Sequence, residues 1–320
     1  MGPCNSTHIK ANLPPSNYIL PNYISKKLSI SNEYILSNTI LGKGTYSTVI
    51  KATEKATHKQ VAIKIIDKTQ TKNIVNILEE ALIHLNIQHH NIVKCESIYE
   101  NKSSIYFILE LINGNDLLSY IINSPNHYLS EAESIELLIQ LLKVINYLHE
   151  DKRIVHRDLK PQNVLIYIND KGESELKVID FGYATKLKNN DSVLSDFVGS
   201  PIYMAPEIIK KDKYKEKVDM WSIGVILFNM LTGFQPFDGN TPDELDNAVI
   251  TKDIYFKAIK NKQLRKLCMG LLEKDPDNRW DSSKALNEAE RIKNEIYSAT
   301  RNDNTNSKLS TLTLRENIIV

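Results

Sequence analysis

The stretch IVHRDLKPQNVLI, residues 154–166, places a His, an Arg, an Asp, a Lys and an Asn between two aliphatic runs. Polar groups so close to a hydrophobic core must be hydrogen-bonded, solvated in a cleft or used in chemistry. The aliphatic ends are typical of short strands that hold a loop on a packed domain. This stretch is therefore the first candidate for a functional loop.

The size and charge of the chain limit the possible classes of protein. Its 320 residues exceed the size of roughly 250–300 residues at which a single core stops growing, which predicts two lobes or one domain with tails. The chain has 40 basic and 39 acidic residues and a net charge of +1. Because this balance lacks the basic footprint of a nucleic-acid binder, no nucleic-acid partner is expected.

The cysteines and the apolar stretches indicate a soluble protein in a reducing compartment, and a cytoplasmic location is expected. Cys4, Cys95 and Cys268 are far apart and form no CxxC pair, which argues against a disulfide framework and a zinc site. The longest strongly apolar stretch, residues 221–231, is about half of what a bilayer crossing needs, and no signal peptide is visible.

The N-terminus, MGPCNS, fits the loose myristoylation pattern, and Cys4 could carry a palmitoyl group. Pro3 lies beside the residue to be acylated and disfavours the modification. Membrane attachment is therefore expected only if Gly2 or Cys4 is acylated, and the alternative is a plain disordered tail.

The first part of the chain predicts a small antiparallel sheet. Residues 1–33 are rich in Asn, Ser and Pro and indicate a disordered tail, with structure beginning near Glu33. Alternating patterns predict three antiparallel strands over 34–66 and two more over 92–100 and 104–111. Between them, a helix is predicted over 73–86, with its apolar stripe formed by Ile74, Ile77, Leu78, Ala81, Leu82 and Leu85.

After the break INGND, long helices dominate. Ser130 and Glu133 form a capping box before a buried helix that extends to about residue 150. A hairpin with the turn NDKG joins 164–168 to 176–181, and 183–206 has no regular period. Further helices are predicted over 217–231, ended by Thr232 and Gly233, over 263–273 and over 282–297.

Two features of the predicted sheet suggest a ligand only weakly. Gly42 and Gly44 let a backbone approach phosphate oxygens, but such a pair in a hairpin is more often a plain turn. Neither a dinucleotide-binding fingerprint nor a P-loop is present. Lys64 ends the apolar triplet VAI and needs a carboxylate partner if it faces inward, and periodicity leaves Glu79 and Glu80 equally possible.

Together these features resemble the protein kinase signature set. Gly42-x-Gly44, Lys64 in VAIK, HRDLKPQN, DFG at 180–182 and APE at 205–207 occur in the order and approximate spacing of that set. The chain resembles a eukaryotic-type serine/threonine protein kinase over about 34–289. The resemblance implies an α+β bilobal fold, with a small antiparallel β-sheet lobe carrying one helix (34–112), a hinge near 110–114, a larger mainly helical lobe (113–289), and a helical extension with a flexible tail (290–320).

The resemblance also implies that the enzyme uses ATP and Mg²⁺. Asp158 would accept or orient the proton of the substrate hydroxyl, and Lys160 would reach the transferred phosphate. Asn163 and Asp180 would hold magnesium.

In the small lobe, Lys64 would contact the α- and β-phosphates, and the usual family spacing selects Glu80 as its partner. Leu109 would be the gatekeeper, and the Glu110 carbonyl and Ile112 amide would bond adenine. The other expected nucleotide-binding residues are Leu41, Gly42 and Gly44 in the phosphate loop, Val49, Ala62 and Leu165 around the purine, and Asp116 near the ribose.

Some positions lie outside the usual pattern or have a structural role. Glu207 and Arg279 match the family pair that forms a buried ion bridge in the large lobe. The third glycine of the phosphate loop is replaced by Ser47. His84 and Cys95 stand where relatives usually have aliphatics, and His84 is expected either as a neutral packed imidazole or as a pH-sensitive group.

The expected substrate is a protein with a Ser or Thr acceptor. Lys160 after HRDL and the GSP at 199–201 resemble the corresponding residues of serine/threonine kinases. Tyr183, the bulky residue after DFG, favours serine over threonine as the acceptor. In relatives, three positions hold carboxylates that select basic residues upstream of the acceptor residue. Here Gln162 and Asn229 are neutral and only Asp116 is acidic, so only a mild preference for basic substrates is expected. Asp196 stands where relatives carry a phosphorylated threonine, beside Ser195, and is predicted to supply a standing negative charge to Arg157.

Two other functions share this fold. A pseudokinase would bind nucleotide or a partner without catalysis. It usually lacks the phosphate-binding lysine, the catalytic aspartate or the metal-binding aspartate, and this chain has all three as Lys64, Asp158 and Asp180. A small-molecule kinase is disfavoured by the GSPIYMAPE segment. The sequence has no EF-hand of its own and lacks the basic helix of a calmodulin target. The calcium/calmodulin-dependent group and the autophagy-initiating kinases are the subgroups with the greatest resemblance.

Overall fold

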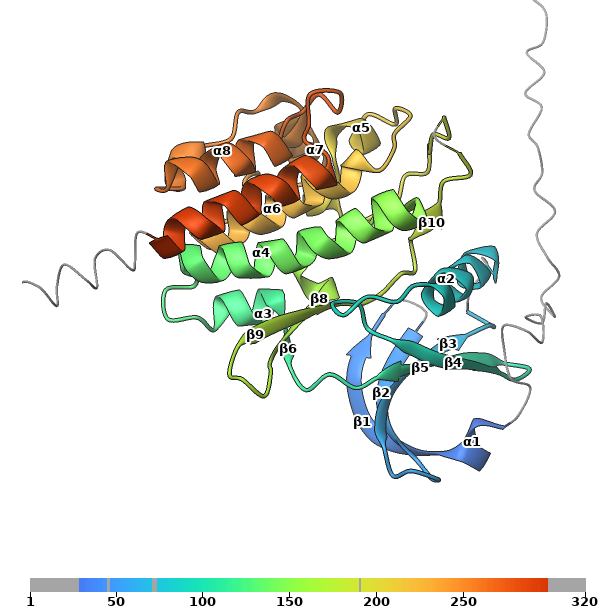
Figure 1. Cartoon of the computed structure of the whole chain (residues 1–320). Helices are drawn as coiled ribbons and strands as arrows, with labels where there is room; N and C mark the ends of the chain where they lie inside the picture. Colours follow the sequence, from blue (N-terminus) through green and yellow to red (C-terminus); the bar gives the residue numbers. More distant parts are fainter. Residues whose placement is uncertain (1–28, 45–46, 71–73, 190, 299–320) are drawn as a thin grey trace, which may run out of the picture. The chain divides into compact units, whose positions relative to one another are not determined.

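The computed structural model describes residues 29–44, 47–70, 74–189 and 191–298 (Figure 1). These residues form two compact units. The smaller unit holds the described residues up to Gln88 and Val93–Ile112, and the larger unit holds His89–Ile92 and the described residues from Asn113 onward. None of the described helices is long and apolar enough to cross a lipid bilayer.

The smaller unit is built on one antiparallel sheet with the strand order β1-β2-β3-β5-β4 (Figure 1). Every neighbouring pair in it is antiparallel, as the alternating sequence pattern predicts. The strands are β1 (Tyr34–Lys43), β2 (Ser47–Glu54), β3 (Gln60–Asp67), β4 (Cys95–Glu100) and β5 (Ser104–Glu110).

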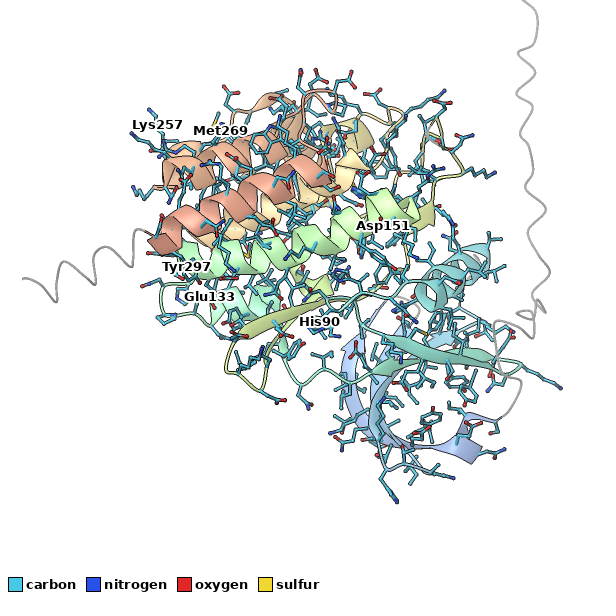
Figure 2. The ribbon with its side chains drawn as sticks, viewed as in Figure 1. His90, Glu133, Asp151, Lys257, Met269 and Tyr297 are labelled. Atoms are coloured by element: carbon cyan, nitrogen blue, oxygen red, sulfur yellow. The ribbon has the colours of Figure 1, made fainter. Side chains whose placement is uncertain are left out.

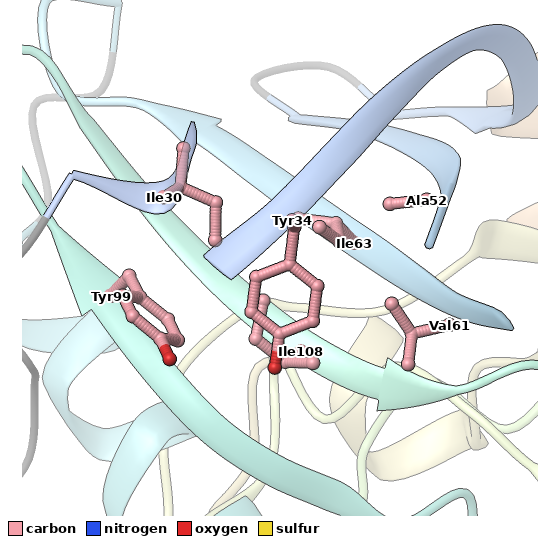
Figure 3. Packing of buried hydrophobic residues seen from close by; sticks show 7 residues of the cluster. All are labelled: Ile30, Tyr34, Ala52, Val61, Ile63, Tyr99 and Ile108. Carbon is pink, nitrogen blue, oxygen red and sulfur yellow. The ribbon is translucent and has the colours of Figure 1, made fainter. Parts of the chain in front are cut away.

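The described residues include structure before Glu33, the predicted tail boundary. A short helix, α1 (Ile30–Glu33), precedes β1, and Ile30 packs into a core cluster of the sheet (Figure 3). Within this cluster the rings of Tyr34 and Tyr99 meet edge to face, with centroids 5.8 Å apart. Tyr99 also donates a hydrogen bond to Glu33. One buried isoleucine in a polar segment is too weak a pattern to predict this turn.

The helix α2 (Ile74–Asn86) lies where the sequence predicts it, but its predicted apolar stripe is only partly right. Ile77 is buried, whereas Leu82 is 38% exposed. The buried residues of α2 include Glu80 and His84. Since these polar side chains have partners inside the unit, the periodicity of apolar residues alone misplaces part of the helix face.

The larger unit contains most of the helices. The helix α4 (Glu131–Asn146) is buried along most of its length, and Ser130 accepts a hydrogen bond from the Glu133 N–H, which confirms the predicted N-cap. A π-helical segment, Tyr147–Lys152, continues α4 and ends at Arg153, whose φ of 55° is left-handed. The remaining strands are β6 (Asn115–Asp116), β7 (Ile154–Val155), β8 (Val164–Ile168), β9 (Ser174–Val178) and β10 (Thr185–Lys186).

The predicted hairpin is present as β8 and β9, and the predicted late helices are present as α6 (Lys217–Thr232), α8 (Lys262–Leu271) and the helix over residues 282–298. The helix α6 packs against α4 and α8. Gly233 ends α6 with a φ of 76°, and a Cβ there would lie 2.5 Å from the His127 carbonyl oxygen, which requires glycine.

Besides α1, three described α-helices were not predicted from the sequence. These are α3 (Leu117–Ile122), α5 (Pro206–Ile209) and α7 (Pro242–Thr251). The start of α7 has a recognisable signal, because Pro242 is its first residue and the Thr241 hydroxyl accepts a hydrogen bond from the Glu244 N–H at 3.2 Å. The short helices α3 and α5 have too few residues for a periodicity to emerge.

The segment His89–Ile92 packs with the larger unit, although the sequence analysis assigns every residue up to 112 to the small lobe. Ile92 bridges to Val178, and the Asn91 amide donates to the Leu176 carbonyl at 2.9 Å. These partners are more than 80 residues away along the chain, so no local pattern predicts them.

The predicted ion bridge of the large lobe is confirmed. Arg279 donates from Nη1 and Nη2 to the two carboxylate oxygens of Glu207, at 2.6 and 2.9 Å, and both side chains are buried. The guanidinium also lies over the ring of Trp221, 5.3 Å from its centroid. This paired charge ties α5 to the residues that follow α8.

Candidate active site

The polar residues of the opening stretch form a compact hydrogen-bond network around Asp158, which is 5% exposed. The Ser200 hydroxyl donates to Asp158 Oδ1 at 2.7 Å, and Lys160 Nζ donates to Oδ2 at 2.7 Å. Lys160 also donates to Ser200 Oγ at 2.8 Å, and the Asn163 amide donates to Asp158 Oδ2 at 3.1 Å. The network fixes the orientation of a carboxylate that can accept a proton.

The backbone of this loop is held by a buried carboxylate on α6. Asp219 Oδ2 accepts the N–H of His156 and Oδ1 accepts the N–H of Arg157, both at 2.8 Å. His149 Nε2 lies 2.9 Å from the same carboxylate. Burial by itself would raise the pKa of Asp219, but the hydrogen bond and charge of His149 lower it overall. Asp219 therefore stays charged and anchors the loop to the core.

Asn163 and Asp180 offer oxygen atoms that suit a hard cation such as Mg²⁺. Asn163 uses its amide nitrogen to donate to Asp158, both to the side chain and to the carbonyl oxygen at 2.8 Å. No described residue donates a hydrogen bond to its amide oxygen, so that atom is the one left for a metal. Asp180 has a left-handed φ of 63° and accepts the Gly182 N–H at 3.3 Å. The residues present therefore fit a magnesium ion.

Arg157 connects this loop to the segment before GSP. Its Nε donates to the Tyr183 carbonyl at 2.7 Å, and its Nη1 donates to Asp196 Oδ2 at 2.8 Å. Tyr214 donates from its hydroxyl to the Asp196 carbonyl at 2.8 Å. Asp196 is thus held at both its side chain and its main chain, although its side chain is 64% exposed.

In the smaller unit, Lys64 forms an ion pair with one of the two candidate glutamates. Its Nζ lies 2.6 Å from Glu80 Oε1, and the two side chains are 13% and 6% exposed. The structure thus selects Glu80 over Glu79, in agreement with the choice made from the family resemblance. Nζ also lies 6.0 Å from the Phe107 ring centroid.

The strand register places several predicted nucleotide-binding residues on one face of the sheet. Val49 pairs with both Gly42 and Lys64, and Ala62 pairs with Leu109. Directly opposed residues, and residues two apart on one strand, point to the same side of a sheet. A side chain at Gly42 would meet no atom of the described residues within 4 Å, so their packing does not require glycine there.

The other predicted binding residues lie at strand ends or in connecting segments. Leu41 is 47% exposed near the end of β1, and Gly44 donates its N–H to the Ser47 carbonyl at 2.8 Å. Glu110 ends β5, and Ile112 follows in an irregular segment.

Asp116 and Leu165 pair with each other between β6 and β8 in the larger unit. Asp116 caps α3, because its two oxygens accept the N–H and the hydroxyl of Ser119 at 2.9 and 2.7 Å. Helix capping therefore accounts for this aspartate without a ligand, and its contact with a ribose stays a prediction.

His84 and Cys95, which the sequence analysis names as departures from the family pattern, are both buried. His84 Nε2 lies 2.9 Å from the Val93 carbonyl oxygen, which explains how a polar ring is tolerated there. Burial raises the pKa of the Cys95 thiol to about 12, so this thiol stays protonated.

Sequence reasoning overlooked Asp219 and Ser200 as members of the site. Asp219 is an acidic residue at the start of an almost wholly apolar helix, and a buried carboxylate must have partners. That contrast is a signal that could have found it. Ser200 was used only to assign a substrate class, and nothing in its local sequence predicts a contact with Asp158, 42 residues away.

Comparison with known proteins agrees with this geometry. Residues 36–289 match the protein kinase domain family. The chain therefore belongs to the protein kinase family, as its sequence motifs predict.

Several curated kinases are similar to this chain. It is 40% identical over 225 residues to calcium-dependent protein kinase 5 of Plasmodium berghei, covering 70% of this chain and 39% of that protein. It is 33% identical over 282 residues to the serine/threonine-protein kinase RAD53 of Saccharomyces cerevisiae, covering 82% and 34%. It is 34% identical over 244 residues to ribosomal protein S6 kinase alpha-1 of Rattus norvegicus, covering 76% and 32%.

These similarities support a eukaryotic-type kinase related to the calcium-dependent kinases. The matches to the first two relatives cover 39% of each relative's length, so those proteins extend well beyond the part shared with this chain.

Proposed function

We propose that the chain is a serine/threonine protein kinase, which transfers the terminal phosphate of ATP to Ser or Thr hydroxyls of proteins. The observation that carries this proposal is the network in which Lys160, Ser200 and Asn163 all bond the carboxylate of Asp158. A loose phosphoryl-transfer transition state needs mainly positioned groups and balanced charge. The network supplies a fixed proton acceptor with a cation beside it.

The larger unit supplies the groups for chemistry. Asp158 accepts or orients the proton of the substrate hydroxyl, and Lys160 neutralises charge on the transferred phosphoryl group. Magnesium, when bound, neutralises charge on the terminal phosphates, and Asn163 and Asp180 would hold it. The Asp219 carboxylate keeps the loop backbone in place through its bonds to His156 and Arg157.

The smaller unit supplies groups for binding ATP. Lys64, oriented by its ion pair with Glu80, would bond the phosphates. Gly42 would let the backbone approach them, which explains a glycine that internal packing does not require. The apolar side chains of Val49 and Ala62 lie on the same sheet face as Lys64 and would pack on the purine.

We further propose that the protein works in the cytoplasm. Cys95 and Cys268 are buried free thiols, which suits a reducing compartment. A fluorescent fusion observed in the source cell tests this location. Acylation at Gly2 or Cys4 concerns positions outside the described residues, and it would appear as label from a fatty-acid analogue.

The experiment that tests the proposed reaction is transfer of labelled phosphate from Mg·ATP to a degenerate serine and threonine peptide library. Asp158→Asn, which keeps the side-chain shape, is expected to lower the rate by at least ~10²-fold, because the proton acceptor is lost. ATP binding is expected to persist in this variant. If wild type binds ATP but labels neither the library nor itself, the protein is a nucleotide-binding scaffold, and the proposal fails.

A further inference from the structure

A groove with basic walls lies in the larger unit, between α8 and the helix over residues 282–298. Its volume is about 590 Å³. The residues that line this basic groove are Lys266, Trp280, Lys284, Asn287, Glu288 and Arg291.

The two helices present these side chains outward because their opposite faces are packed. On α8, Leu264 and Leu267 are fully buried, and Lys266 is exposed. Met269, which is labelled in Figure 2, is 49% exposed. On the other helix, Ala285, Ala289 and Ile292 are fully buried. The walls of the groove are therefore fixed by core packing on both sides.

Trp280 forms an apolar part of the lining. The backbone N–H of Trp280 donates to the Gly270 carbonyl at 3.0 Å, and a Cβ at Gly270 would lie 2.3 Å from the indole ring. The ring therefore packs directly on the backbone of α8 at a position where only glycine fits. Lys284 Nζ lies over this ring, 4.8 Å from its centroid. The groove thus combines a held aromatic surface with an oriented ammonium group.

The charges of the groove are unbalanced. Its lining carboxylate, Glu288, accepts two hydrogen bonds from Arg291 at 2.8 Å each, and these bonds lower the pKa of Glu288. Within the described part of the chain, no carboxylate lies within ion-pair distance of Lys266 or Lys284. The lining therefore offers two ammonium groups that form no close ion pair, although the charge of Lys266 reaches Glu288 and helps to lower its pKa.

We propose that the basic groove binds an acidic peptide segment of a partner protein. Carboxylates of the peptide pair with Lys266 and Lys284, beside the Trp280 ring, and the Asn287 amide bonds the peptide backbone. Complementary charge gives the contact its specificity and speeds association. The groove contains none of the residues assigned to ATP or to phosphoryl transfer, so this docking is independent of the proposed catalysis.

Intrinsic fluorescence tests the proposal on the full chain. The sequence has two tryptophans, and Trp221 is fully buried, so a response at the surface reports Trp280. The probe is the hexapeptide Glu-Glu-Leu-Glu-Glu-Leu with blocked ends. A saturable change is expected, absent in Trp280→Phe. The double variant Lys266→Gln/Lys284→Gln is expected to weaken binding about fivefold, the effect of two exposed ion pairs.

Three controls make the outcome decisive. Lys252→Gln/Lys257→Gln changes the net charge equally at exposed lysines outside the groove and is expected to keep the affinity. The same peptide with Gln for Glu is expected not to bind, and phosphorylation of a peptide substrate is expected to be unchanged in the groove variant. Equal binding of the neutral peptide, or unchanged affinity in the groove variant, overturns the proposal. Binding to vesicles with anionic lipid but not to the acidic peptide overturns it in favour of a membrane surface.

Discussion

Arg157 and Asp196, separated by 39 positions in sequence, are joined by a hydrogen bond of 2.8 Å from Nη1 to Oδ2. The arginine side chain is 8% exposed and its guanidinium is held by the Tyr183 carbonyl as well. The carboxylate of Asp196 thus lies where it can supply the standing negative charge to Arg157 that the sequence predicts. It carries about half the charge and fewer acceptor atoms, so its hold on the segment is weaker than that of a phosphate.

Replacing this carboxylate is expected to reduce activity without abolishing it. Because Asp196 is largely exposed, the pair contributes about 0.2–1 kcal/mol, and Asp196→Ala should lower kcat/KM about twofold to fivefold. Cleavage of residues 191–198 by a protease should become faster. Asp212→Ala, at an exposed aspartate nearby, is the matched control. Unchanged activity together with unchanged protease sensitivity would remove the role given to Asp196.

The ion pair of the smaller unit predicts different effects for two adjacent glutamates. Glu80→Gln removes the charge that orients Lys64 and is expected to reduce kcat/KM for ATP by at least about tenfold. Glu79→Gln, with the same chemical change one position earlier, should have little effect. Steady-state kinetics at varied ATP concentration compares them. Equal losses in both variants would contradict the assignment of Glu80.

The buried bridge between Glu207 and Arg279 is expected to dominate the stability of its region. Glu207→Ala leaves a buried guanidinium without its carboxylate, and its loss should cost about 3–5 kcal/mol in the free energy of unfolding. Lys59→Ala, which breaks the exposed pair with Glu96, should cost less than about 1 kcal/mol. Urea unfolding followed by circular dichroism measures both. A loss below about 1 kcal/mol for Glu207→Ala would show that the bridge is dispensable.

Glu175 gives a pH-dependent prediction. Hydrogen bonds from Tyr167 and then Asn169 lower its pKa to about 2, from an ordinary value of 4.5. Since the folded-state pKa is depressed, its contribution to stability is complete above pH 4.5 and is lost as the pH falls through about 2. In Tyr167→Phe the pKa should rise toward 4.5, as measured by NMR titration of the Glu175 carboxyl carbon.

Tyr255→Phe provides the control for this titration, because Tyr255 is 71% exposed and forms no part of the β8–β9 hairpin. An unchanged titration of Glu175 in Tyr167→Phe would mean that the Tyr167 hydroxyl does not hold the carboxylate.

The local sequence pattern predicts those features in which a residue's role depends on its neighbours in the chain. Alternation predicted the five strands of the sheet, the capping box at Ser130 predicted the start of α4, and the order of motifs predicted the family. The expectation that Lys64 needs a carboxylate was also derived from its position in an apolar strand. These features follow from backbone period, turn chemistry and the cost of burying charge, which act over a few residues.

Only the tertiary structure decided which distant groups meet. The packing of α2 brought Glu80 to Lys64, a choice that periodicity left open and that only the family resemblance had predicted, and it buried His84 against the Val93 carbonyl. Asp219 met the backbone of the catalytic loop from more than 60 positions away. The groove between α8 and the last described helix likewise exists only because two amphipathic helices bury their opposite faces. The periodicity of apolar residues predicts whether a side chain faces inward or outward. Side-chain packing between helices and strands decides which partner that side chain contacts.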